Sequence, residues 1–76
     1  MAKPNLENKF VKRRKALGVS QSQIAEAIGR DVRSISDWEN GRRLPELNPR
    51  QFANLCLLLQ CSIHDLANDF EQLNQN

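Results

Sequence analysis

The stretch SQSQIAEAIGRDVRSISDWENG, residues 20–41, decides the fold because it holds two short amphipathic segments with one tight connection between them. The first segment opens at Ser20 with the S-x-x-Q spacing of a capping box, and two isoleucines follow one helical turn apart. It ends at Gly29, since glycine readily adopts the left-handed backbone that closes many helices. These residues predict a helix over 21–28.

The second segment predicts another helix, over residues 32–39. Asp31 can cap it through its carboxylate, and an Asn-Gly pair that tolerates positive φ stops it. Ile35 and Trp38 are three residues apart, so they share a face, which we expect to point into the core. With the small Ala25 where the two helices would cross, this spacing is typical of a helix-turn-helix.

The opposite face of this second helix is expected to be open to solvent, because the core occupies its inward face. It carries side chains that are short or directional, as the reading of a groove requires: Val32, Arg33, Ser36 and Asp37. The helix therefore offers a surface that could recognise a partner.

The rest of the chain predicts three further helices. Apolar residues line one face of residues 6–17, and capping patterns open two more helices at Asn48 and Ser62. Because glycines and prolines fall between the apolar clusters, the expected class is all-α. The 76 residues suffice for one compact five-helix bundle but not for an enclosed substrate cavity. The expected division is an N-terminal arm (1–5), a helix-turn-helix domain (6–70) and a polar C-terminal tail (71–76).

Charge is unevenly distributed along the chain. All eleven Lys and Arg lie in residues 1–50 against six acids, a net of +5, whereas residues 51–76 carry three acids and no base, a net of −3. A basic half suits a polyanionic partner, although a merely solvated charged face fits the same observation. The same two interpretations apply to the basic cluster of the arm and first helix: Lys3, Lys9, Lys12, Arg13 and Lys15.

Other classes of site find little support in the sequence. Cys56 and Cys61 are five residues apart with no further cysteine, so we interpret them as buried thiols in preference to a metal or disulfide site. His64 is the only histidine, and no triad spacing, phosphate-cradling glycine loop or metal-ligand cluster is found. We therefore expect no enzyme, cofactor, metal or small-molecule ligand. No stretch approaches the ~20 apolar residues of a membrane span, so we expect a cytoplasmic protein without membrane contact.

Over residues 6–67 the chain resembles the phage-repressor type of helix-turn-helix, the XRE or Cro-like family with a lambda-repressor-like DNA-binding domain. The resemblance rests on these positions: Leu17-Gly18-Val19-Ser20-Gln21, Ile24-Ala25, Ile28-Gly29, Ile35-Ser36, Glu39-Asn40-Gly41-Arg42 and Pro45. It implies a sequence-specific, double-stranded-DNA-binding transcriptional regulator whose third helix reads the major groove while the first two contact the backbone. We also expect a homodimer on a two-fold site, because one small domain makes few base contacts.

The resemblance also assigns roles to individual residues. Val32, Arg33, Ser36 and Asp37 match base-reading positions, and the backbone-contact positions are matched by Ser20, Gln21, Gln23, Arg30, Asn40, Arg42 and Arg43. Arg33 could bond guanine O6 and N7, and Val32 could touch a thymine methyl group. Asp37 could accept from cytosine N4 or, as we prefer, orient Arg33 one turn back. Structural support is expected from Arg14, Ile35, Trp38 and Glu39, with Glu39 paired to Arg14.

Two positions depart from the family pattern: Arg30 stands where an apolar residue is usual, and Gln60 replaces the glycine that usually ends the fourth helix. A left-handed Gln60 should cost up to ~1 kcal/mol. Dimer contacts are expected from the fifth helix and the tail, with candidates that could equally be core: Leu66, Phe70 and Leu73. The alternative function is a protein-interaction adaptor or antitoxin-like partner subunit with secondary DNA binding. The arginines on the groove-reading face and the following loop argue against it.

Overall fold

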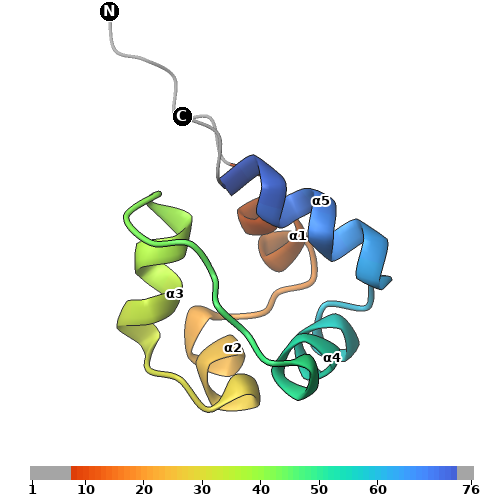
Figure 1. Ribbon diagram of the computed structural model, residues 1–76, viewed down its shortest axis with the longest axis horizontal. Helices are drawn as coiled ribbons and strands as arrows, with labels where there is room; N and C mark the ends of the chain where they lie inside the picture. The colour runs from red at the N-terminus through yellow and green to blue at the C-terminus, as the bar shows by residue number, and fades with distance from the viewer. Residues whose placement is uncertain (1–7, 74–76) are drawn as a thin grey trace, which may run out of the picture.

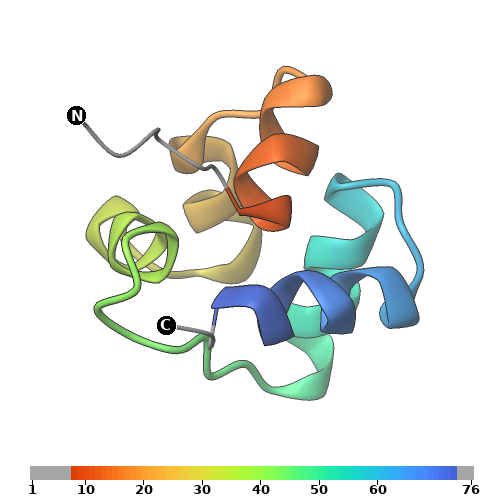
Figure 2. The same ribbon diagram turned by 90° about the horizontal axis from the view of Figure 1, so that it is seen from above.

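The computed structural model describes residues 8–73, which form five helices and no strand. These are α1 (Lys9–Ala16), α2 (Gln21–Ile28), α3 (Val32–Glu39), α4 (Pro49–Leu58) and α5 (Ile63–Leu73). Helix α2 packs against α3 and α4, and helix α5 packs against α1 and α4. Figures 1 and 2 both place α3 at one edge of the molecule and the α4–α5 turn at the opposite edge. The predicted all-α, five-helix architecture is confirmed.

Helices α2 and α3 begin and end where their local signals predict. Ser20 Oγ accepts from the Gln23 amide at 3.0 Å, and Gln23 Oε1 accepts from the Ser20 amide at 2.8 Å, which completes the capping box. Gly29 ends α2 in the left-handed conformation, with φ at 68°. The Asp31 carboxylate caps α3 by accepting from the amide and the hydroxyl of Ser34, each at 3.0 Å. These hydrogen bonds lower the pKa of Asp31.

The first and last helices differ from prediction at their ends. Helix α1 starts at Lys9 and not at residue 6, because Asn8 caps it by accepting from the amide three residues on at 2.8 Å. Helix α5 continues to Leu73, three residues into the expected polar tail, since Phe70 packs into the core and anchors the last turns. The expected arm (1–5), Leu6 and residues 74–76 lie outside the described part of the chain.

The core contains side chains from all five helices. Trp38 is 1% exposed and lies edge-on to Phe10, with ring centroids 6.4 Å apart, and to Phe70, with centroids 6.2 Å apart. The expected inward face of α3 is confirmed, since Ile35 is also fully buried. Helices α1, α3 and α5 thus share one aromatic cluster, and the rest of the core is formed by Ile24, Ala25, Ile28, Leu55, Cys56, Leu59 and Leu66.

Candidate nucleic-acid interface

Helix α3 presents one face to solvent at the edge of the molecule (Figure 1). Two core side chains hold its inner face, whereas Val32 is 41% exposed and Arg33 is exposed at its first turn. Ser36 and Asp37 follow one turn later and are half-buried. The four residues predicted to read bases therefore share one side of the helix, since residues four apart lie one above the other.

The carboxylate of Asp37 faces the loop after α3. Its oxygens lie 3.6 Å from Arg42 Nη1 and 3.9 Å from Arg43 Nε, and the carbonyl oxygen of Asp37 accepts from the Arg42 amide at 2.8 Å. Gly41, with φ at 75°, turns the chain so that both arginines come back beside the end of α3. Asp37 thus faces Arg42 and Arg43, and the preferred assignment from sequence, that it orients Arg33, stays a prediction.

Glu39 joins three helices beneath this surface. Its Oε2 accepts from Arg14 Nε at 2.7 Å, and its Oε1 accepts from Arg14 Nη2 at 3.1 Å and from Gln21 Nε2 at 2.8 Å. The side chains of the ion pair are only 12% (Arg14) and 8% (Glu39) exposed. The expected ion pair between Arg14 and Glu39 is present. The Glu39 carboxylate also binds the side-chain amide of Gln21, a group that we expected to reach a phosphate. The carboxylate therefore fixes α1 and α2 relative to α3.

Several residues expected to contact the DNA backbone are bonded within the protein. Arg30 Nη2 donates to the carbonyl oxygen of Glu46, and Asn40 Nδ2 donates to the carbonyl oxygen of Ser36 at 2.9 Å. Arg42 and Arg43 differ, since 68% of each side chain is exposed. At the start of α2 the Gln23 amide donates to Ser20 Oγ, whereas the Gln21 and Ser22 amides precede the first hydrogen bond along the helix and are donors that an anion could use.

The fold thus holds a capped helix, a left-handed glycine turn and a second helix with one open face. A family model described as helix-turn-helix matches residues 11–66, about three quarters of the chain. The chain belongs to the XRE-type helix-turn-helix family. It is accordingly a DNA-binding transcription regulator of that type, and the family is not typically enzymatic. No curated protein and no solved structure matches the chain.

Sequence reasoning missed an ion pair that ties α1 to α5 of this helix-turn-helix domain. Asp69, which is 1% exposed, accepts from Arg13 Nε at 2.7 Å, and this contact raises the pKa of Arg13. The sequence pattern places Arg13 only in the basic cluster of the arm and first helix. The available signal was that Asp69 follows the core residue Leu66 by three positions and so falls on the inner face of α5.

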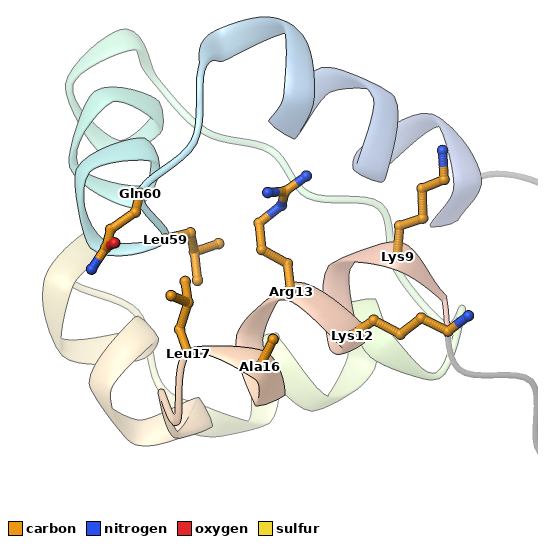
Figure 3. A pocket seen from close by; sticks show the side chains of 7 residues that line it. All are labelled: Lys9, Lys12, Arg13, Ala16, Leu17, Leu59 and Gln60. Carbon is orange, nitrogen blue, oxygen red and sulfur yellow. The ribbon is translucent and has the colours of Figure 1, made fainter.

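A separate cleft of about 430 Å³ opens between α1 and the end of α4 (Figure 3). Leu17, expected on the inner face of the first helix, is 39% exposed here and points toward Leu59, while Arg13 rises from α1 nearby and Lys12 extends away from the two leucines. No residue of α3 lines this cleft. Within residues 8–73, no three side chains gather as metal ligands. None of the helices in that range is both long and apolar enough to cross a membrane.

Proposed function

We propose that α3 enters the major groove of double-stranded DNA and reads a specific site. The observation that carries the proposal is the two-sided character of α3, whose inner face is core while Val32 and Arg33 stand exposed at its first turn. A guanidinium can donate to guanine O6 and N7 together, and a valine methyl group can pack against a thymine methyl group. Ser36 and Asp37, one turn later, would meet the next base edges, with Asp37 accepting from cytosine N4.

Arg42 and Arg43 supply phosphate contacts in this proposal. Both are exposed on the loop beside the end of α3, where Asp37 holds them within 4 Å. The start of α2 would contact a second stretch of backbone through its open amides, with the side chains of Ser20, Gln21 and Gln23 around them. Arg30 and Asn40 would act indirectly, by shaping the turns that carry these contacts.

A homodimer on a two-fold site completes the proposal. Each good base contact is worth ~1–3 kcal/mol, so one α3 alone gives modest discrimination. Two copies with recognition helices ~34 Å apart would reach successive major grooves on one side of the duplex. As a DNA-bound regulator the protein would act in the cytoplasm.

Two of the three fifth-helix candidates for dimer contacts, Leu66 and Phe70, face the core of their own chain. Leu66 is fully buried, and Phe70 packs against Phe10 and Trp38, so both serve the core of the same chain. The side chain of Leu73 lies outside the described part. Among the side chains that the structure describes, the large apolar ones that are exposed outside α3 and the cleft beside α1 are Leu44, Leu57 and Ile63.

Selection of bound duplexes from a random pool tests the proposal. We expect one enriched motif with two halves related by two-fold symmetry. Arg33→Ala should weaken binding to that motif by ~5-fold to ~100-fold and relax the preference at one position.

Lys12→Ala is the matched control, because it removes the same charge from the cleft side of α1. It should weaken binding slightly and equally for all duplexes. Equal losses in the two variants, or no duplex binding by the unaltered chain, would overturn the proposal and favour a protein-interaction adaptor.

A further inference from the structure

Cys56 and Cys61 form a pair at the end of α4. The Cys61 amide donates to the Cys56 carbonyl oxygen at 3.1 Å, and the Gln60 amide donates to the Leu57 carbonyl oxygen at 3.3 Å. Gln60, at φ 51°, is the left-handed residue of this Schellman turn. Such a turn brings together the side chains of the two residues joined by the hydrogen bond that spans five residues, from the Cys61 amide to the Cys56 carbonyl oxygen. Here both of those residues are cysteines.

The two thiols open onto the same surface cleft. This cleft has a volume of about 640 Å³, and both cysteines line it together with Leu57 and Ile63. Cys56 is buried and Cys61 is half-buried. Burial raises the pKa of the Cys56 thiol, and the neighbouring Cys61 thiol opposes part of that rise. A small oxidant can therefore reach one sulfur while the second sulfur stands beside it.

We propose that Cys56 and Cys61 are a site of reversible oxidation to an intramolecular disulfide, with a peroxide as the oxidant. The Cys61 thiol first loses its proton. The thiolate then forms a bond to one peroxide oxygen and the O–O bond breaks, which leaves a sulfenic acid on Cys61. The departing hydroxide takes up the released proton and becomes water. The Cys56 sulfur then attacks the sulfenic acid sulfur. The S–S bond forms, the S–O bond breaks, and a second water leaves with the Cys56 proton. The two thiols lose two electrons, which reduce one peroxide to two waters.

The surroundings of the pair set the order and the pH dependence of this reaction. Burial raises the pKa of both thiols, while the Arg13 guanidinium opposes the rise at Cys61 and Asp65 and Asp69 add to it. Cys61 reacts first because it is more exposed and has this cation nearby. The thiolate is scarce at neutral pH, so the oxidation rate should rise about tenfold per pH unit below the thiol pKa.

This turn lies at the opposite edge of the molecule from α3 (Figures 1 and 2). The disulfide would tie the last turn of α4 to the start of α5 without contacting the α3 surface. Oxidation and DNA binding can therefore be measured separately, and failure of one proposal leaves the other intact.

Thiol counting on the unaltered folded chain is the deciding experiment. After exposure to hydrogen peroxide, denaturation and alkylation, we expect both thiols to be lost, a mass lower by two hydrogens, and a monomer on a non-reducing gel. A dithiol should restore both thiols. Two alkylatable thiols after a dose that fully oxidises free glutathione would overturn the proposal, and so would cross-linked dimers as the main product.

Single variants test the order of the two steps. In Cys56→Ala the sulfenic acid at Cys61 has no partner, so it should accumulate and be labelled by dimedone. Cys61→Ala should show much less label at Cys56 under the same dose. Equal labelling of the two variants would overturn the assigned order, and the thiol count on the unaltered chain still decides the site if a variant does not fold.

Discussion

Glu39→Gln tests whether the ion pair beneath α3 holds the domain together. Glutamine keeps the shape of glutamate but places an NH2 group where one carboxylate oxygen now accepts from Arg14. The nearly buried guanidinium then loses its counter-charge. Removing one partner of a buried ion pair costs ~3–5 kcal/mol. Because Arg14 also donates to the Val19 carbonyl oxygen at 3.1 Å and keeps some solvent contact, we expect a loss of ~2–4 kcal/mol in the free energy of unfolding.

Urea denaturation followed by the fluorescence of Trp38, the single tryptophan, measures this loss. The midpoint should fall while the slope of the transition stays unchanged. Asp37→Asn is the control, because it makes the same chemical change two residues earlier. Its arginine partners are 68% exposed, so we expect a loss below ~1 kcal/mol. If the two variants lose the same stability within ~0.5 kcal/mol, the reasoning about Glu39 is refuted.

Four further measurements follow from the same contacts. Four to six phosphate contacts predict that the logarithm of the association constant for DNA falls with the logarithm of the salt concentration, with a slope of roughly −4 to −5. Arg43→Ala should make this slope less steep by ~0.9, and an unchanged slope would exclude a phosphate contact at Arg43. Asp37→Asn should tighten binding at low salt to duplexes that lack the selected motif, with the difference vanishing at high salt. Gln60→Gly should raise the free energy of unfolding by up to ~1 kcal/mol, and with it the urea midpoint, because glycine adopts the left-handed backbone of this position without strain. A lower midpoint would contradict the backbone strain inferred at Gln60. Hydrogen bonds from Ser34 lower the pKa of Asp31, so the ionised carboxylate stabilises the fold at neutral pH and this stabilisation is lost as the pH falls. Asp31→Ala should therefore lower the free energy of unfolding at pH 7, and the difference from the unaltered chain should shrink below about pH 4.

The sequence predicts the helix-turn-helix segment well because its signals are local. A capping box, a left-handed glycine and an Asn-Gly stop act within a few residues of the ends they define, and both helices have the predicted bounds. Helix α1 was predicted too long because its apolar pattern was given more weight than the capping potential of Asn8. Local signals set helix ends, so a polar residue that can cap outweighs an apolar one upstream of it.

The partners of charged residues are less predictable, because they depend on where distant segments return. Arg13 and Asp69 are 56 residues apart, and only the packing of α5 on α1 brings them together. Arg42 and Arg43 are close to Asp37 in sequence, yet the turn at Gly41 decides that they reach its carboxylate. The Arg14–Glu39 pair came from the family resemblance, since the spacing alone does not identify it.

The order Asp37-Trp38-Glu39 explains how one turn of α3 connects the interface to the rest of the fold. Consecutive residues of a helix point about 100° apart, so three neighbours face three directions. Trp38 enters the aromatic core, Glu39 binds α1 and α2, and Asp37 faces the arginines of the following loop. The position of the loop arginines relative to α3 is therefore set by the same turn that fixes α3 to the core. A change in the packing of Trp38 should accordingly reach the loop arginines through the backbone of α3.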